Sequence, residues 1–130
     1  MTMDDTLNGL RLLLVEDEYV LALGLAVLLE DLGANVLGPV ASVEDALALV
    51  RDVPEIDAAI LDVNVGSELV YPVADALLAR GVPFFFSTAQ DPALMPERFH
   101  GMPLCPKPFD AQRFRAALAH LQPQPGRLVA

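Results

Sequence analysis

The sequence predicts a doubly wound α/β fold, in which helices cover both faces of a five-stranded parallel sheet. Apolar runs of strand length alternate with segments of helical periodicity, which is the pattern of repeated strand–helix units. The runs are almost continuous, as in strands buried on both faces. With 130 residues, 54% of them hydrophobic, the chain can bury one sizeable core but is too short for two.

The first strand and helix are clearly marked. The run LRLLLV at 10–15 has strand length and ends abruptly in three consecutive acids. A helix is expected over 19–32, ended by Gly33. The residues of its expected core stripe recur at helical spacing: Leu21, Leu25, Leu28, Leu29 and Leu32.

Turn and cap signals divide the middle of the chain. The segment 35–41 reads as a strand, and its internal Gly-Pro pair favours a position at the edge of the sheet. Ser42 followed by Asp45 resembles a capping box and opens a helix over 43–51. A short buried strand at 58–61 then runs directly into an aspartate.

Two further strand–helix units follow. Pro72 suits the first turn of a helix that ends at Gly81, and 84–86 is the core of a fourth strand. A weak strand at 103–105 precedes the last helix, over 110–121.

The connection between the fourth and fifth strands is expected to be irregular. A helix started by Asp91 and Pro92 would contain Pro96, which removes a hydrogen bond, so this helix should be short or poorly ordered. After the last helix, 122–130 reads as a loose tail, and 1–9 as an N-terminal extension.

Composition narrows the range of functions. A net charge of −10 argues against binding nucleic acid through this domain, because phosphate contacts need a basic face. Cys105 is the only cysteine, so no internal disulfide forms, which suits a reducing compartment. The start of the chain carries acids where a signal peptide needs positive charge, and no apolar run is long enough for a membrane span. We expect a soluble cytoplasmic protein without membrane contact.

Polar residues collect where the predicted strands end. Glu16 and Asp17 follow the first strand, Asp62 ends the third, Thr88 ends the fourth and Lys107 follows the fifth. The neighbouring serine at 87 is the weaker candidate because it still belongs to the strand. Doubly wound sheets bind ligands beyond the carboxyl ends of their strands, so these side chains are expected on one rim.

The chemistry of this set points to phosphoryl transfer. Crowded carboxylates repel one another, and Mg²⁺, which prefers oxygen ligands, relieves that repulsion. A carboxylate can also attack phosphorus to give an aspartyl phosphate. A metal, a hydroxyl and an ammonium would neutralise the charge on the moving group. Lys107 is the only lysine in the chain, beside an X-Pro bond prone to the cis form.

The motifs at these positions resemble those of the receiver domain of two-component response regulators. They are the acid pair Glu16-Asp17, the strand-end Asp62, the pair Thr88-Ala89 and the triplet Lys107-Pro108-Phe109, and the resemblance spans about 10–121. It implies one receiver domain over 10–121, with the flavodoxin-like strand order 2-1-3-4-5. It also implies a regulator that accepts a phosphoryl group, not an enzyme.

The resemblance implies a role for each residue. Asp62 would accept the phosphoryl group from a sensor histidine kinase or a histidine phosphotransfer protein. Asp17, Asp62 and the backbone carbonyl of Asn64 would bind Mg²⁺, with Glu16 acting mostly through water. Thr88 and Lys107 would contact the phosphoryl oxygens.

The chain departs from the family pattern at three places. Gly66 stands where many receivers have proline, and Leu104 where a switch tyrosine or phenylalanine is usual. The segment FSTAQ at 86–90 is partly similar to the F-A-T-G-Y motif of a group of stand-alone receivers.

Two other functions fit the residues less well. A phosphohydrolase resembling the haloacid dehalogenases needs a second aspartate two residues after the nucleophile, and here that residue is Asn64. A pseudo-receiver that binds a partner without phosphorylation would not need an intact acceptor, acid pair, threonine and lysine.

Two surface hypotheses follow. No charged residue lies between Tyr19 and Leu29, so the outer face of the first helix (Ala22, Leu23, Ala26 and Val27) suits a kinase helix, a second copy of the chain, or the C-terminal tail. Since Leu104 lacks an aromatic ring, the segment 90–101 is the candidate for the part that responds to phosphorylation.

Overall fold

The computed structural model describes residues 7–121. The predicted tail over 122–130 and most of the predicted extension over 1–9 lie outside the described residues. Within that expected extension, Leu7 is buried and its backbone N–H donates to the Leu32 carbonyl oxygen at 3.1 Å.

The centre of the fold is a parallel sheet of five strands in the order β2-β1-β3-β6-β7. This is the predicted order 2-1-3-4-5, since β4 and β5 form a separate short hairpin that the sequence analysis did not foresee. The strands of the main sheet are β1 (Arg11–Val15), β2 (Asn35–Val40), β3 (Ala58–Asp62), β6 (Phe84–Thr88) and β7 (Leu104–Pro106). The hairpin strands are β4 (Asn64–Val65) and β5 (Glu68–Leu69).

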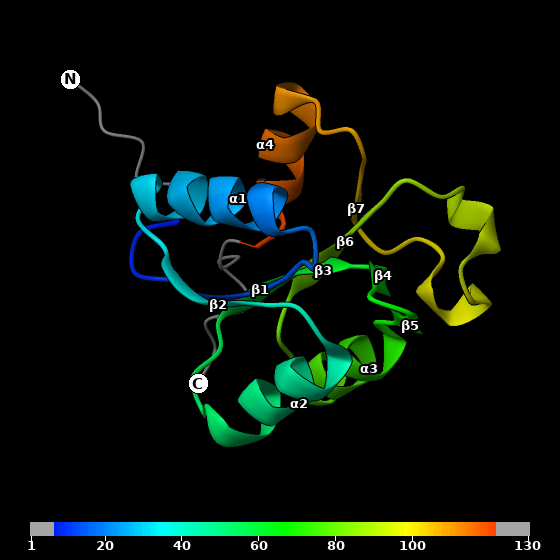
Figure 1. Cartoon of the computed structure of the whole chain (residues 1–130), viewed down its shortest axis with the longest axis horizontal. Coiled ribbons are helices and arrows are strands. Elements are labelled where there is room, and N and C mark those ends of the chain that lie inside the picture. The colour runs from blue at the N-terminus through cyan, green and yellow to red at the C-terminus, as the bar shows by residue number, and fades with distance from the viewer. Residues whose placement is uncertain (1–6, 122–130) are drawn as a thin grey trace.

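Helices cover both faces of the sheet, as predicted (Figure 1). On one face lie α1 (Tyr19–Asp31) and α4 (Ala111–Ala119), and on the other α2 (Val43–Asp52) and α3 (Tyr71–Ala79). Because strand side chains alternate between faces, β6 contributes Phe85 to the first core and Phe84 and Phe86 to the second.

The predicted edge position of β2 is confirmed. The backbone of this strand also requires a glycine at position 38. Gly38 has φ +103°, a conformation that side chains disfavour. A Cβ at Gly38 would lie 2.6 Å from the Val40 backbone nitrogen and 3.0 Å from the Leu14 carbonyl oxygen. The pairing of β1 with β2 shifts register at this point, so the glycine accommodates an irregularity in the edge strand.

The rotation of α1 differs from the prediction. Leu28, expected in the core stripe, is 41% exposed, whereas Ala22, expected outside, is 3% exposed. The residues that face the core are Ala22, Leu25, Leu29 and Leu32. The physical reason is that this helix is apolar around most of its circumference, so periodicity alone does not decide which apolar stripe packs on the sheet.

The other helices follow their sequence signals. The Ser42 side chain accepts a hydrogen bond from the backbone N–H of Asp45 at 3.0 Å, as a capping box requires. Pro72 lies in the first turn of α3. At the start of α4, the Asp110 carboxylate accepts hydrogen bonds from the backbone N–H groups of Gln112 and Arg113.

The connection between β6 and β7 contains no α-helix. Two short 3₁₀ turns take its place, η1 (Pro92–Leu94) and η2 (Glu97–Phe99). Pro96 separates them, which is where the sequence analysis expected a helix to fail. None of the helices between residues 7 and 121 has the length and apolar character that crossing a bilayer requires.

Candidate functional site at the carboxyl edge of the sheet

Three carboxylates meet at the carboxyl ends of β1 and β3. Oxygen atoms of Glu16, Asp17 and Asp62 all lie within 4.8 Å of one another. Glu16 and Asp62 are buried, whereas Asp17 is exposed. The parallel sheet explains the arrangement, since β1 and β3 are neighbours in register and both end at this rim.

Lys107, which follows the edge strand β7, completes the cluster. Its Nζ donates to Glu16 Oε1 at 3.0 Å and to Asp62 Oδ2 at 3.2 Å. Lys107 follows β7, and β6 lies between β7 and β3, so the lysine side chain extends across the end of β6. Its own backbone N–H donates to the Thr88 carbonyl oxygen at 2.9 Å, and the peptide bond to Pro108 is cis.

Backbone N–H groups hold the three carboxylates in place. The N–H of Asn64 donates to Asp62 Oδ1 at 3.2 Å, and the N–H of Glu18 to Glu16 Oε2 at 3.1 Å. The N–H of Gly66 donates to Asp17 Oδ2 at 2.6 Å. Proline, usual in the family at the Gly66 position, has no N–H to give. The departure from the family pattern therefore supplies a contact between the β4–β5 hairpin and the acid pair.

Burial and charge both act on the Asp62 carboxylate. The pKa of Asp62 is raised to about 6, because burial and then the Glu16 carboxylate raise it by more than the charge and hydrogen bond of Lys107 lower it. Burial would lower the pKa of Lys107, but its hydrogen bond to Glu16 and the charges of Asp62 and Glu16 outweigh that effect, so this pKa is raised. Lys107 therefore stays protonated in the cluster, where its single positive charge faces three carboxyl groups.

The donor set suits a hard divalent cation. Glu16, Asp17 and Asp62 offer only carboxylate oxygens, which Mg²⁺ prefers over nitrogen or sulfur. One lysine does not balance three carboxylates. The acidic cluster can thus hold a metal ion, as the sequence analysis predicted.

Thr88 and Asn64 lie where the sequence placed them. Thr88 is the buried last residue of β6, and its Oγ1 accepts a hydrogen bond from the Gln90 N–H at 3.0 Å, so its own O–H remains a donor. Asn64 begins β4, two residues after Asp62 ends β3. Binding of a metal by its backbone carbonyl stays a prediction.

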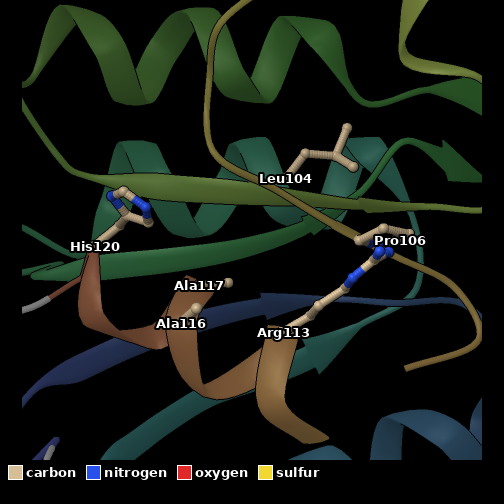
Figure 2. Close-up of a pocket in the computed structure, with 6 residues that line it drawn as sticks. All are labelled: Leu104, Pro106, Arg113, Ala116, Ala117 and His120. Atoms are coloured by element: carbon tan, nitrogen blue, oxygen red, sulfur yellow. The ribbon is translucent and has the colours of Figure 1, made fainter. Parts of the chain in front are cut away.

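Sequence reasoning missed the surface features around β7. A cleft of about 290 Å³ lies between this edge strand and α4. Figure 2 shows Arg113 extending toward Pro106 at one end of the cleft and His120 at the other end. A second cleft, of about 480 Å³, separates Leu104 from the 3₁₀ turns. The spacing of residues in the sequence did not predict these clefts, because they depend on how α4 and η2 pack beside the three-residue strand β7.

Solved structures resemble this chain over nearly its full length. SdrG from Sphingomonas melonis Fr1 is 40% identical, with 93% of this chain and 98% of that chain covered and a TM-score of 0.68. The beryllofluoride-activated conformation of SdrG, from Pseudomonas melonis Fr1, is also 40% identical, with 92% and 98% covered and a TM-score of 0.72. The non-phosphorylated HemR receiver domain from Leptospira biflexa is 27% identical, with 89% and 99% covered and a TM-score of 0.70.

No protein-family model matches the chain, and no curated protein sequence does. The fold and these likenesses define an α/β domain with the flavodoxin-like parallel sheet of receiver domains. The chain belongs to the receiver domains of response regulators.

Proposed function

We propose that the chain is a phosphorylation-activated signalling switch, in which Asp62 accepts a phosphoryl group from a histidine kinase or a histidine phosphotransfer protein. The observation that carries the proposal is the meeting of Asp62 with Glu16, Asp17 and Lys107 at one rim, from segments far apart in the sequence. The likeness to SdrG, which has a beryllofluoride-activated conformation, supports it.

The transfer makes one bond and breaks one. A carboxylate oxygen of Asp62 bonds to phosphorus while the bond between phosphorus and the donor's imidazole nitrogen breaks. That nitrogen keeps the electron pair and later takes a proton from solvent. Lys107 leaves the Asp62 carboxylate for the phosphoryl oxygens, and the Thr88 hydroxyl donates to another of them.

Mg²⁺ belongs to this proposal. Glu16, Asp17 and Asp62 would hold it together with the carbonyl of Asn64, and when bound it would neutralise charge on the carboxylates and the phosphoryl oxygens. The chain's own residues then orient the acceptor: the Asn64 N–H fixes one oxygen of Asp62 and Lys107 the other.

We further propose that the protein is a stoichiometric regulator in the cytoplasm and not an enzyme that turns over substrates. Asn64, two residues after the acceptor, has a neutral side chain that cannot serve as the general acid of a phosphohydrolase. An intact acceptor with its lysine also speaks against a pseudo-receiver.

A titration with beryllofluoride and Mg²⁺, followed by ¹⁹F NMR, tests the proposal. One bound beryllofluoride per chain, lost in Asp62→Asn, is the expected result. Acetyl phosphate should label Asp62 once per chain, with no more phosphate released than slow self-dephosphorylation gives. Rapid turnover of small phosphate esters would point to a hydrolase, and no response to either reagent would point to a pseudo-receiver.

The outer face of α1 is proposed as the docking site for the phosphoryl donor. The helix begins two residues after Asp17, close to the carboxylate cluster. Its exposed large side chains are apolar or aromatic: Tyr19, Val20, Leu23, Val27 and Leu28. In addition, α1 has no side-chain cap, no acid in its first turn and no base in its last. A surface helix with so little polar character fits an apolar partner helix beside the acceptor.

A matched pair of variants tests this docking. Leu23, on α1, is 44% exposed, and Leu78, on α3 across the sheet, is 47% exposed. Leu23→Arg should slow phosphotransfer from the donor protein by more than about tenfold, the equivalent of roughly 1.4 kcal/mol, because it places a charge in an apolar contact. Leu78→Arg should not, and neither variant should alter labelling by acetyl phosphate. Equal rates for both variants would remove α1 as the donor site, and loss of a dimer in Leu23→Arg would reassign the face to self-association.

A further inference from the structure

The Asp17 carboxylate is held differently from the other two acids of the cluster. Glu16 and Asp62 are 3% and 6% exposed, and both accept a hydrogen bond from Lys107. Asp17 is exposed, and within residues 7–121 its carboxylate receives one hydrogen bond, from the backbone N–H of Gly66 at 2.6 Å. The orientation of this exposed side chain therefore depends on a single donor.

The turn of the β4–β5 hairpin makes the Gly66 N–H available. Val65 pairs with Glu68, so Gly66 and Ser67 form a two-residue turn between the strands. Gly66 has φ +63°, and a glycine with positive φ at the first position of such a turn is typical of type II′. The ladder of a hairpin joins the paired strand residues, which leaves the N–H of this turn residue for Asp17. Proline cannot replace this glycine, because it fixes φ at about −65° and has no N–H.

The backbone donors of the other two carboxylates are local. Glu16 and Asp62 each accept a hydrogen bond from the backbone N–H two residues later in the chain. Such bonds form together with the turn that follows each strand. The bond from Gly66 to Asp17 spans 49 positions instead, and it joins the β4–β5 hairpin to the segment that follows β1. The position of the hairpin thus decides where Asp17 points.

We infer that Gly66 is a positioning residue of the metal site: its N–H holds Asp17 in the orientation that Mg²⁺ requires, which makes the site selective for Mg²⁺ over Ca²⁺. The inference rests on the proposed function, in which Asp17 is a ligand of the metal. Mg²⁺ demands near-ideal octahedral geometry, whereas Ca²⁺ accepts a flexible arrangement of oxygens. A ligand that is oriented in advance therefore favours the more exacting ion. Donors that orient metal ligands commonly contribute about 10- to 100-fold to metal affinity.

The hydrogen bond from Gly66 and the metal do not compete for the same atom. The N–H engages Oδ2 of Asp17, and the other oxygen of the carboxylate remains for the cation. Asp17 can therefore keep its donor before and after metal binding. Glu16 and Asp62, by contrast, must be shared between Lys107 and the incoming cation. Asp17 is thus the ligand that can be set in place before the metal arrives.

The experiment compares Gly66→Pro, Gly66→Asn and Gly101→Pro with the wild-type chain. Gly66→Pro removes the N–H, whereas asparagine retains it and is one of the few residues that tolerate positive φ. A Cβ at this position would meet no atom within 4 Å beyond its chain neighbours, so the asparagine has room. Gly101→Pro imposes a similar backbone change at another exposed glycine, with φ +87°, outside the acid cluster.

Two quantities are measured for each chain. The dissociation constants of Mg²⁺ and of Ca²⁺ come from separate ¹H–¹⁵N NMR titrations at constant ionic strength. The melting temperature in EDTA checks that each variant is folded before metal is added. The ratio of the two dissociation constants is the decisive quantity, because a purely structural role of Gly66 would weaken both ions alike.

We expect Gly66→Pro to bind Mg²⁺ roughly tenfold more weakly than wild type, but Ca²⁺ less than about threefold more weakly. Gly66→Asn, which restores the N–H, and Gly101→Pro should match wild type for both ions. Wild-type Mg²⁺ affinity in Gly66→Pro would overturn the inference, and so would an equal loss for the two ions. A Gly66→Asn variant as weak in Mg²⁺ binding as Gly66→Pro would also overturn it.

Hydrogen exchange in the wild-type chain gives a test that does not require the proline variant to fold. The Gly66 amide should exchange more slowly than the amide of Ser67, its neighbour in the same exposed turn, and more slowly still in Mg²⁺, because the bound metal holds Asp17 in place. Equal exchange at the two amides in saturating Mg²⁺ would overturn the inference. If the wild-type chain binds no Mg²⁺ at all, the metal site of the proposed function falls and takes this inference with it. That result is recognisable because it needs none of the glycine variants.

Discussion

The carboxylate cluster with Lys107 and the β6–β7 connection both adjoin the carboxyl end of β6, but the cluster is held by many hydrogen bonds and the connection is not. At the site, each carboxylate accepts a backbone hydrogen bond, and Lys107 joins Glu16 to Asp62. The connection consists of two 3₁₀ turns and loops with an exposed Leu94, and few of its side chains reach the interior. Its anchors are Met95 and Phe99, both buried.

This difference suits the two parts to different roles in the proposed function: the cluster to phosphoryl transfer, and the connection to the conformational response. Transfer of a charged group needs donors and acceptors held in place in advance, and the site has them. A segment with short turns and few buried contacts has low local stability and can shift at small energetic cost. Phe99 links the connection to the interior, since its ring lies 5.1 Å from that of Tyr71 on α3 and 5.3 Å from that of Phe86 on β6. Phe86 in turn lies two residues before Thr88.

The largest expected effect concerns the acceptor itself. Asp62→Asn removes the nucleophile and one charge of a repulsive cluster, so uptake of phosphate from acetyl phosphate should be abolished while the fold stays intact. Mass spectrometry of the intact protein measures the uptake, and circular dichroism checks the fold. Phosphorylation that persists at another residue would overturn the assignment of Asp62.

The pH dependence of stability gives the next largest effect. Because the pKa of Asp62 is raised to about 6 from an ordinary value of 3.8, the folded state binds the proton more tightly than the unfolded state. Asp62 therefore favours folding fully below about pH 4, and this contribution is lost as the pH rises through about 6. In EDTA, Asp62→Asn should be more stable than wild type at pH 7 by about 2 to 3 kcal/mol relative to their difference near pH 4.

Urea denaturation of both proteins between pH 4 and pH 8 measures this dependence. Carboxylates remote from the cluster are common to the two chains, so the difference reports on Asp62 together with the Glu16 and Lys107 groups that interact with it. A difference in unfolding free energy that stays constant across the range would mean that burial does not perturb Asp62.

Mg²⁺ should stabilise the unphosphorylated protein by a smaller amount. A ligand that binds only the folded state, at ten times its dissociation constant, adds about 1.4 kcal/mol. Thermal melting with and without Mg²⁺ measures the gain, which should vanish in Asp17→Asn. Asp75→Asn, on α3 and paired with Arg98, is a charge-matched control that should keep it. An unmoved melting curve in the wild-type chain would exclude the acid cluster as a metal site.

The sequence was enough to predict the strands of the main sheet, because continuous apolar runs and their polar ends are local signals, and the resemblance to receiver domains supplied the order of those strands. It also predicted the residues that meet at the rim, since parallel strands bring their carboxyl ends together. It could not set the rotation of α1, where Leu28 and Ala22 exchange the expected places. Neither the hydrogen bond from the Gly66 N–H to Asp17 nor the buried, unpaired hydroxyl of Ser87 on β6 was foreseen, because both depend on how distant segments meet in three dimensions.

The β6–β7 connection gives the smallest and most local prediction. The Thr88 hydroxyl accepts from the Gln90 N–H, so a threonine that turns toward a phosphoryl group alters the first residue of the connection. We expect hydrogen exchange across 90–101 to slow by several-fold on addition of beryllofluoride and Mg²⁺. The change should be lost in Thr88→Ala, while exchange in α2 stays constant.

The Tyr71–Phe99 stack offers a second measurement of the same event. The chain has two tyrosines and no tryptophan, so Tyr19→Phe leaves Tyr71 as the only strong intrinsic fluorophore. Because Phe99 belongs to the connection and Tyr71 to α3, any displacement of the connection alters the surroundings of the Tyr71 ring. Tyrosine fluorescence of this variant should change with beryllofluoride at the same half-saturation as the ¹⁹F signal. Bound beryllofluoride with neither slower exchange nor altered fluorescence would rule out 90–101 as the responding segment.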